Sequence, residues 1–365
     1  MKARVIIGAN LGDEGKGTVV ANYTKGNDNV LNILTNGGAQ RGHSILTKDG
    51  NVTYQHFGSG TYYGADSYYS RFFILNPMQF TKEYNELLVK PKNVFRDKDC
   101  RWSTIFDMMA NAFECFEKKT HATCGMGIWN TIKRYNELGS MSFDTFMSLD
   151  YRVKIKWLTS VKEYYEKKIK IPVDQEVIWN SEFIMRHFIM DCTFMKMHTK
   201  TVGLNEITGY ENLIFENGQG LLLSDTGKDT PYTTPSQTGS TYANMLLIDM
   251  GILDENGNTV GDNDVMLHYV TRPYLTRHGD GGMESEMPRN NLSKDVNNDR
   301  TNNWNEFQGE FRYGKLDIQS LKDRVRNDAS DLPFEIELTH CDEMDRVSEF
   351  EKEFDKVNIY DSPLV

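Results

Sequence analysis

VIIGANLGDEGKGT, residues 5–18, joins a short apolar run to a glycine-rich turn that contains two carboxylates and a lysine. The apolar run, Arg4 to Ile7, is typical of a buried strand. Closely spaced glycines let backbone N–H groups approach phosphate oxygens, and Lys16 adds a positive charge. A helix that starts near Thr18 would direct its positive end to the same place. The segment therefore predicts a strand followed by a phosphate-binding loop.

This loop differs from the common G-x-x-x-x-G-K-[ST] phosphate loop. Gly17 separates Lys16 from Thr18, so the lysine and the hydroxyl residue are not adjacent. Asp13 also lies inside the loop, although phosphate sites usually exclude negative charge. We therefore expect Asp13 either to bind Mg²⁺ or to remove a proton from a substrate.

The composition restricts the class of protein. The 365 residues are enough for a sizeable core, and we expect one large α/β domain. A net charge of −11 argues against binding to nucleic-acid backbones but leaves small phosphate-bearing molecules possible. No apolar run approaches the roughly 20 residues of a membrane span, and the five cysteines show no C-x-x-C pair. We expect a cytoplasmic protein without a nucleic-acid or membrane partner.

The string G-x-x-x-G-D-E-G-K-G, from Gly8 to Gly17, resembles the signature of the adenylosuccinate synthetase family. Members of that family join L-aspartate to the 6-oxo position of a purine nucleotide at the expense of a nucleoside triphosphate. Five separate islands of resemblance occur in the family's order. The segments that resemble family motifs include residues 36–44, 123–128, 213–223 and 225–236. The resemblance implies an α/β fold with a mostly parallel central sheet flanked by helices. It also implies Mg²⁺ as cofactor and a homodimer with composite sites.

The resemblance assigns the chemistry to a few side chains. It implies that Asp13 removes the N1 proton of the purine and then binds Mg²⁺ together with the Gly42 carbonyl. Lys16 would balance the phosphate charge, and His43 would stabilise charge on the transferring phosphoryl group. The residues expected to bind the triphosphate are Gly12, Gly15, Lys16, Gly17, Thr18, Gly42 and Asp342.

The substrate nucleotide has its own set of expected contacts, which are Gln40, Thr123, Cys124, Gln219 and Thr234. Cys124 stands where the family motif has a threonine, and Met126 stands where it has an arginine. Either Lys133 or Arg134 could supply the missing charge, because in the family an arginine after this loop reaches the neighbouring subunit's site.

The family's arginine-rich string that grips the carboxylates of aspartate is absent. Arg312 is the best candidate for a carboxylate or phosphate clamp, with Arg272 and Arg277 behind it. The segment Pro273–His278 is an insertion, relative to the family motif, before the next glycine turn.

Two segments carry no expected chemistry. Residues 143–195 are helix-like, and the part from Arg152 to Lys170 is rich in alternating charge, which predicts a solvated helical insertion. Residues 285–305 are rich in asparagine and predict a long flexible loop. Both are expected to belong to the single domain of residues 1–365.

Two purine nucleotides, dGMP and IMP, are candidates for the acceptor substrate. The departures from the family motifs, including His340 in place of a lysine, indicate a divergent member whose composition resembles that of a phage protein. Phage relatives make 2-aminoadenylosuccinate from dGMP for diaminopurine DNA, and they use ATP or dATP as the donor. The resemblance to a phage protein therefore favours dGMP as the acceptor. Many of them replace the catalytic aspartate with serine, whereas this chain keeps Asp13, so IMP with GTP is the alternative. A catalytically inactive nucleotide-binding regulator is the alternative from another class.

Overall fold

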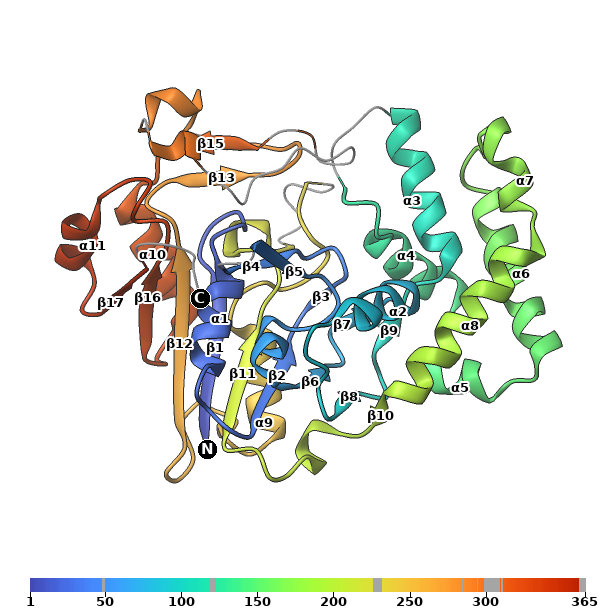
Figure 1. The fold of residues 1–365 in the computed structure, drawn as a ribbon, viewed down its shortest axis with the longest axis horizontal. Coiled ribbons are helices and arrows are strands. Elements are labelled where there is room, and N and C mark those ends of the chain that lie inside the picture. Colours follow the sequence, from blue (N-terminus) through green and yellow to red (C-terminus); the bar gives the residue numbers. More distant parts are fainter. Residues whose placement is uncertain are drawn as a thin grey trace.

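The fold is built on one parallel sheet (Figure 1). The computed structural model describes residues 1–47, 50–118, 123–225, 232–283, 285–293, 295–298, 309 and 311–360. Within these residues, nine strands pair in parallel. Their order across the sheet is β10 (Lys200–Thr201), β8 (Val94–Arg96), β6 (Asp66–Tyr69), β2 (Val30–Leu34), β11 (Asn212–Glu216), β1 (Lys2–Gly8), β12 (Asp264–Thr271), β16 (Phe334–Leu338) and β17 (Val357–Ile359).

The central strands are apolar because both faces of the sheet are covered. On one face, Val5 of β1 and its neighbours in β11 and β12 join a core that includes α9 (Thr241–Asp249) and α10 (Ile318–Ala329). On the other face, Ile6 packs with residues of α1 (Lys16–Thr24). The expected parallel α/β sheet flanked by helices is thus confirmed.

The smaller sheets lie beside the carboxyl ends of the central strands. β12 points toward β13 (Leu275–Arg277) and β15 (Arg312–Gly314) at the top of Figure 1. β14 (Glu286–Met287) pairs with β15, and β4 (His43–Thr47) forms a hairpin with β5 (Gly50–Tyr54). A third small sheet contains β3 (Gly37–Gly38), β7 (Phe73–Leu75) and β9 (Arg101–Trp102).

Helices at the right of Figure 1 form what we call the helical lobe, α3 to α8. Its members are α3 (Ile105–Lys118), α4 (Ile128–Leu138), α5 (Phe143–Ser148), α6 (Tyr151–Glu166), α7 (Glu176–Trp179) and α8 (Glu182–His198). The remaining helices are α2 (Pro77–Glu86), which packs on α8, and α11 (Val347–Glu353).

The expectation that residues 143–195 are solvated is wrong. Leu158, Tyr165, Trp179 and Phe188 are buried in a core shared with α3 and with β7. The alternating charges occupy the outer faces of these helices, while aromatic side chains at helical spacing face inward. The charge pattern therefore predicted the outer faces of these helices correctly but not their buried faces.

Part of the loop expected near 285–305 lies outside the described residues. Its described parts contain β14 and two short 3-10 turns, Arg289–Asn291 and Asp295–Asn298.

Arg134 is an internal structural residue of the helical lobe. It is fully buried, and its Nε donates to Asp107 Oδ1 at 2.8 Å. The Tyr165 hydroxyl donates to the same carboxylate oxygen at 2.5 Å. A guanidinium held in this way is not available to a nucleotide, so the suggestion that Arg134 supplies charge to one is corrected. Lys133 is exposed.

We expect Asp107→Ala to lower the free energy of unfolding by about 3–5 kcal/mol, because it leaves the Arg134 charge buried without its partner. Chemical denaturation measures this change. Glu137→Ala is the control, since it removes an ion pair with Lys168 in which both side chains are largely exposed, and we expect little change. Equally small effects of the two substitutions would contradict the interpretation.

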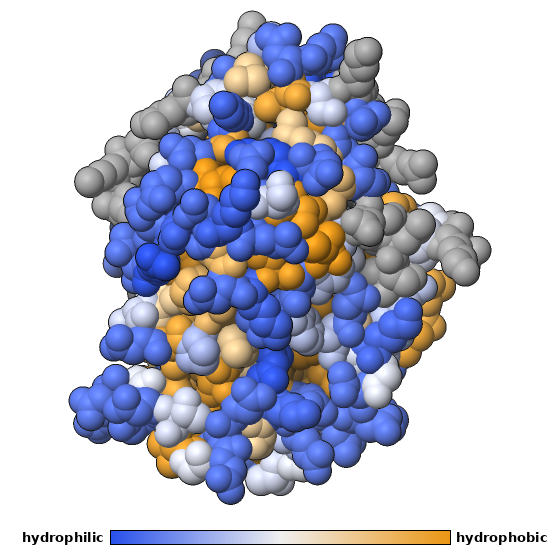
Figure 2. Space-filling view, turned by 90° about the vertical axis from the view of Figure 1, so that its left-hand side faces the viewer, coloured by the Kyte–Doolittle hydropathy of each residue, from blue (hydrophilic) through white to orange (hydrophobic). Residues whose placement is uncertain are grey.

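The side of the molecule that carries α11 and β17 is mostly hydrophilic, with hydrophobic side chains visible between the polar ones (Figure 2). Among the helices of the described residues, none has the length and apolar composition that a membrane span requires.

Candidate active site

A cavity of about 600 Å³ lies at the carboxyl ends of the central strands. The loops that follow β1, β2, β11, β12 and β16 all contribute to its walls. This is the position at which open parallel sheets bind ligands, because neighbouring loops diverge there. A smaller cavity of about 130 Å³ adjoins it, and five residues line both: Gln40, Cys124, Gln219, Leu223 and His278.

The predicted phosphate loop lines the larger cavity. Gly12, Asp13, Gly15, Lys16, Gly17 and Thr18 are all in its wall, as is Gly42 of the second loop. Helix α1 begins at Lys16, two residues earlier than expected, after Gly15 with φ 86°. Asp13 also has a positive φ of 57°, which is uncommon for a residue with a side chain. The Arg272 Nε donates to the Asp13 carbonyl at 2.7 Å and helps hold this conformation.

The Asp13 carboxylate opens into the cavity, with 36% of its side chain exposed. Its Oδ2 lies 3.2 Å from His278 Nδ1. Burial alone would raise the pKa of Asp13, but His278, Lys16 and Arg272 together hold it below the usual value. Asp13 is therefore an ionised group that can accept a proton or bind a cation.

Glu14 and Lys16 form a buried pair beneath the loop. Glu14 Oε1 accepts a hydrogen bond from the Asn10 N–H at 2.5 Å, and Oε2 lies 3.9 Å from Lys16 Nζ. Burial raises the pKa of Glu14 to about 7, and burial also lowers the pKa of Lys16. The 3.9 Å between Glu14 Oε2 and Lys16 Nζ is longer than a hydrogen bond, so the pair leaves the lysine nitrogen able to contact a phosphate.

His43 is oriented by a buried carboxylate. Its Nδ1 lies 2.5 Å from Glu216 Oε1, and the same carboxylate accepts from the Ser59 hydroxyl at 2.8 Å and the Ser59 N–H at 3.0 Å. Arg41 lies 3.8 Å from it. Burial opposes the charge of Glu216, but Arg41 and the hydrogen bonds from His43 and Ser59 lower its pKa to about 2. Burial lowers the pKa of His43 to about 4. A carboxylate can only accept, so His43 Nδ1 carries the hydrogen.

Two amide side chains meet over Gly37. A Cβ atom at this position would lie 2.9 Å from Gln40 Nε2 and 3.2 Å from Gln219 Oε1. Among the described residues, both polar atoms of Gln40 and the Oε1 of Gln219 are buried without a hydrogen-bond partner. Buried polar groups are normally paired, so these atoms indicate a polar ligand.

The other predicted nucleotide contacts lie around the smaller cavity. Thr123, Cys124 and Thr234 are in its wall. The Thr123 hydroxyl donates to Asn111 Oδ1 at 2.9 Å, and burial raises the pKa of the Cys124 thiol to about 11. Cys124 is therefore a neutral thiol near pH 7.

Of the three arginines proposed as clamps, two line a cavity and one does not. Arg312 lines neither cavity; its Nε donates to Glu286 at 2.8 Å and its Nη1 to the carbonyls of Gly279 and Gly281. Arg272 lines the larger cavity and Arg277 the smaller one. Arg312 thus supports the neighbouring turn, and the two arginines expected behind it are the ones at the cavities.

After the end of β16, the residue that lines the cavity is not the expected one. Asp342 is exposed and lines neither cavity, whereas His340, two residues earlier, is buried and lines the larger one. His340 has a positive φ of 58°.

Sequence reasoning missed three residues of the site: Arg41, Glu216 and His278. Glu216 ends the buried strand β11, and a charged residue at the carboxyl end of an apolar strand was the available signal. The sequence pattern places His278 in an insertion, and its distance in sequence from Asp13 hides the contact.

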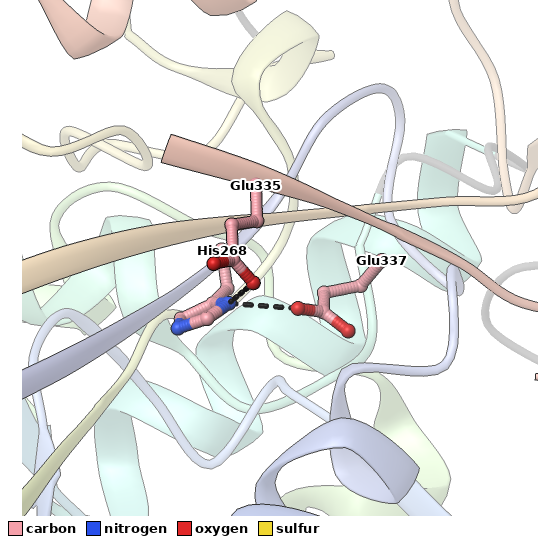
Figure 3. Close-up of side chains that lie close together, drawn as sticks. All are labelled: His268, Glu335 and Glu337. Atoms are coloured by element: carbon pink, nitrogen blue, oxygen red, sulfur yellow. Dashed lines mark hydrogen bonds and ion pairs between the residues drawn. The ribbon is translucent and has the colours of Figure 1, made fainter. Parts of the chain in front are cut away.

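Figure 3 shows a second titratable cluster, which contains His268, Glu335 and Glu337. These three residues are not among those that line the two cavities. His268 Nδ1 lies 2.7 Å from Glu337 and 3.9 Å from Glu335. Tyr23, Asn358 and Tyr360 donate hydrogen bonds to these carboxylates. Because the carboxylate oxygens already accept from protein donors, we assign the cluster to the structural connection between α1, β16 and β17.

The fold and the site define a nucleotide-binding α/β protein with a phosphate loop. The family model described as adenylosuccinate synthetase matches residues 5–352. The chain therefore belongs to the adenylosuccinate synthetase family, a family of carbon–nitrogen ligases.

Relatives and solved structures agree with this assignment. The chain is 25% identical over 296 residues to the adenylosuccinate synthetase of Acaryochloris marina, covering 78% of this chain and 62% of that protein. It is 26% identical over 300 residues to that of Syntrophotalea carbinolica, covering 78% and 65%. The chain thus spans less than two thirds of the length of these curated relatives.

Two solved structures share the fold. Fully ligated adenylosuccinate synthetase from Plasmodium falciparum superimposes with a TM-score of 0.69 at 19% identity, covering 94% of this chain and 78% of that chain. Succinoaminodeoxyadenylate synthetase of cyanophage S-2L, bound to dGMP and to dATP as an energy donor, gives a TM-score of 0.60 at 13% identity, covering 98% and 91%.

Proposed function

We propose that this protein joins L-aspartate to C6 of a purine nucleoside monophosphate, through a 6-phosphoryl intermediate formed from a nucleoside triphosphate. The observation that carries the proposal is the convergence of Asp13, Lys16, His43 and Gln219 on one cavity. The preferred acceptor is dGMP or GMP, the product 2-aminoadenylosuccinate, and the donor ATP, dATP or GTP. The proposal includes a phage origin, a homodimer and a cytoplasmic location.

Each of these residues has a separate role in the proposed reaction. The Asp13 carboxylate accepts the N1 proton, so that O6 gains the electron density to attack the γ-phosphorus of the triphosphate. Lys16 and His43 lie where they can stabilise charge on the transferring phosphoryl group. The amine of aspartate then attacks C6, and the C6–O bond breaks with release of phosphate. Gln40 and Gln219 orient the purine through their unpaired amide atoms.

The same wall fits a magnesium ion. Asp13 offers a carboxylate and Gly42 a carbonyl, and both line the larger cavity. Oxygen ligands of this kind are those that Mg²⁺ prefers. A bound Mg²⁺ would neutralise part of the charge of the triphosphate.

The aspartate substrate needs a cationic partner. Arg272 and Arg277 line the larger and the smaller cavity, respectively, and are the candidates for holding its carboxylates. Arg312 becomes a candidate only if it gives up its ion pair with Glu286.

Two sets of similar proteins favour different acceptors. The cyanophage enzyme, which is bound to dGMP and dATP, supports a guanine nucleotide. The relatives named adenylosuccinate synthetase, and the retained Asp13, support IMP with GTP as the alternative.

Phosphate release tests the proposal. The full chain is incubated with L-aspartate, Mg²⁺ and ATP, and dGMP, IMP or no purine is added. We expect release that requires both dGMP and aspartate. Release with IMP alone would replace the proposed acceptor by IMP. No release with either purine, although nucleotide binds, would favour an inactive nucleotide-binding regulator, which the missing arginine string also suggests.

A further inference from the structure

The phosphate loop that follows β1 depends on outside contacts for its shape. Gly12, Asp13 and Gly15 have φ values of 92°, 57° and 86°, so the loop turns through left-handed conformations instead of continuing a strand or a helix. The Thr339 hydroxyl donates to the Glu14 carbonyl at 2.8 Å. Buried backbone groups in such a turn need partners from other segments, so the side chains that supply those partners set the course of the loop.

Asn10, at the start of this loop, is a buried residue whose polar groups all have partners. Its N–H donates to Glu14 Oε1 at 2.5 Å, and its carbonyl accepts from the Leu222 N–H at 2.9 Å. Its side-chain Nδ2 donates to the Thr271 hydroxyl at 2.9 Å, and its Oδ1 accepts from Arg324 Nη2. Asn10 therefore joins the loop to three segments that are distant in sequence.

Arg324 binds the loop from outside the site. It belongs to α10 and is not among the described residues that line the two cavities. Its Nε donates to the Ala9 carbonyl at 2.8 Å, and its Nη2 donates to Asn10 Oδ1. Both acceptors belong to buried residues, and hydrogen bonds from a charged donor are among the stronger ones. Without the guanidinium, two buried oxygens would lose this donor, which favours a shift of the loop.

The contacts of Asn10 reach the larger cavity through Glu14. Glu14 accepts from the Asn10 N–H with Oε1, and its Oε2 lies 3.9 Å from Lys16 Nζ. Lys16 lines the larger cavity and supplies the positive charge of the loop. A shift of Asn10 would therefore move the Glu14–Lys16 pair. Gln40 and Thr234, which are expected to contact the acceptor nucleotide, belong to other loops.

We propose that Arg324 is a positioning residue for the triphosphate, because it holds Ala9 and Asn10 in the place from which the phosphate loop presents Lys16 to the phosphates. The inference rests on the proposed function, in which this loop binds the triphosphate. The contribution of Arg324 is to the shape of the loop and not to direct contact with the phosphates. Loss of its hydrogen bonds should weaken the binding of the triphosphate and leave the binding of the acceptor nucleotide nearly unchanged.

Titration calorimetry with the full chain measures the two affinities separately and needs no turnover. ATP with Mg²⁺, or GTP with Mg²⁺ if ATP does not bind, is one ligand, and dGMP alone is the other. Arg324→Met removes the donors but keeps a long side chain. We expect its affinity for the triphosphate to be about tenfold lower than that of the wild-type protein, and its affinity for dGMP to stay within about threefold. In steady-state phosphate release, the KM for the triphosphate should rise by a similar factor, while the KM for dGMP should not.

Two further variants serve as controls. Arg326→Met removes a positive charge from an exposed position of the same helix and should change neither affinity. Arg324→Lys keeps the charge but has one nitrogen where the guanidinium has two donors in use, so its affinity for the triphosphate should lie between those of the wild-type protein and Arg324→Met. Circular dichroism and urea denaturation establish that each variant is folded at the temperature of the titration. If Arg324→Met does not fold, Arg324→Lys carries the comparison.

The outcomes distinguish this inference from the proposed function. An unchanged affinity for the triphosphate in a folded Arg324 variant, or an equal loss of both affinities, would overturn the role of Arg324 even if the wild-type protein releases phosphate normally. A loss confined to the triphosphate would support it, even if no purine supports phosphate release and the proposed reaction fails. A wild-type protein that binds neither ATP nor GTP would overturn both.

Discussion

Asp13→Asn is expected to lower the rate of phosphate release with dGMP by about 10²–10⁴-fold, because an amide cannot accept the N1 proton. The substitution is mild in every other respect. Asparagine has the same shape, can accept the hydrogen bond from His278 through its carbonyl oxygen, and tolerates the positive φ of this position.

Single-turnover phosphate release, with saturating dGMP, ATP and aspartate, measures the effect on the chemical step. Calorimetric titration with dGMP is the control and should show an affinity within a few-fold of the wild-type value. A rate within tenfold of wild type would show that another group removes the proton.

Glu216→Gln is expected to lower the same rate by about 10²–10⁴-fold, by reversing the hydrogen bond to His43. The side-chain amide introduced by this substitution would donate to Nδ1, so the hydrogen of the neutral ring would move to Nε2. The change also removes the counter-charge 3.8 Å from the buried Arg41, and we expect the free energy of unfolding to fall by about 3–5 kcal/mol.

The dependence of the free energy of unfolding on pH reports the contribution of the Glu216 charge, which Glu216→Gln removes while keeping the shape of the side chain. Its pKa is about 2 in the folded protein against a usual value of 4.5. The folded state therefore binds fewer protons than the unfolded state in this range. The stabilisation is complete above pH 4.5 and is lost as the pH falls toward 2. Denaturant titrations should show a larger loss in the wild-type protein than in Glu216→Gln, because the other carboxyls whose pKa is lowered by folding, such as Asp13 and Asp144, titrate in both proteins.

Ser59→Ala is the matched control for Glu216. It removes the hydroxyl donor at 2.8 Å but leaves the backbone N–H of residue 59 at 3.0 Å. We expect a loss of about 1 kcal/mol in stability and a small effect on rate. A comparable loss of activity in Ser59→Ala and Glu216→Gln would contradict the role of the carboxylate in orienting His43.

The parts of the fold that could be predicted are those set by local pattern. The apolar run before Gly8 and the strand Val30–Leu34 appear where periodicity placed them. The burial of residues 143–195 was misjudged, although their helical character was predicted. The charge alternation along α6 was visible in the sequence, whereas the inward packing of Trp157 and Trp179 depends on helices that meet only in the folded chain.

The residues of the site also fall into those that local sequence predicts and those that distant segments supply. Lys16 and His43 begin the elements that follow glycine-rich turns, and Gln219 lies in such a turn, so the local composition indicated all three. The partners that tune them come from distant segments: Glu216 reaches His43, and His278 reaches Asp13. Arg312 is predicted because residues 312–317 resemble the family's R-x-G-x-L-D string, and its ion pair with Glu286 could not be inferred from spacing.

The position of β11 has a consequence for synthesis on the ribosome. It pairs with both β1 and β2, yet the whole helical lobe lies between β2 and β11 in sequence. A nascent chain that has reached the end of α8 therefore carries two strands with unpaired inner edges, which are prone to association with other chains. Asp13 and His43 leave the ribosome early, but their partners emerge much later. The wall of the larger cavity is complete only after β12, β13 and β16 have been added, and molecular chaperones have a long interval in which to cover the open edges.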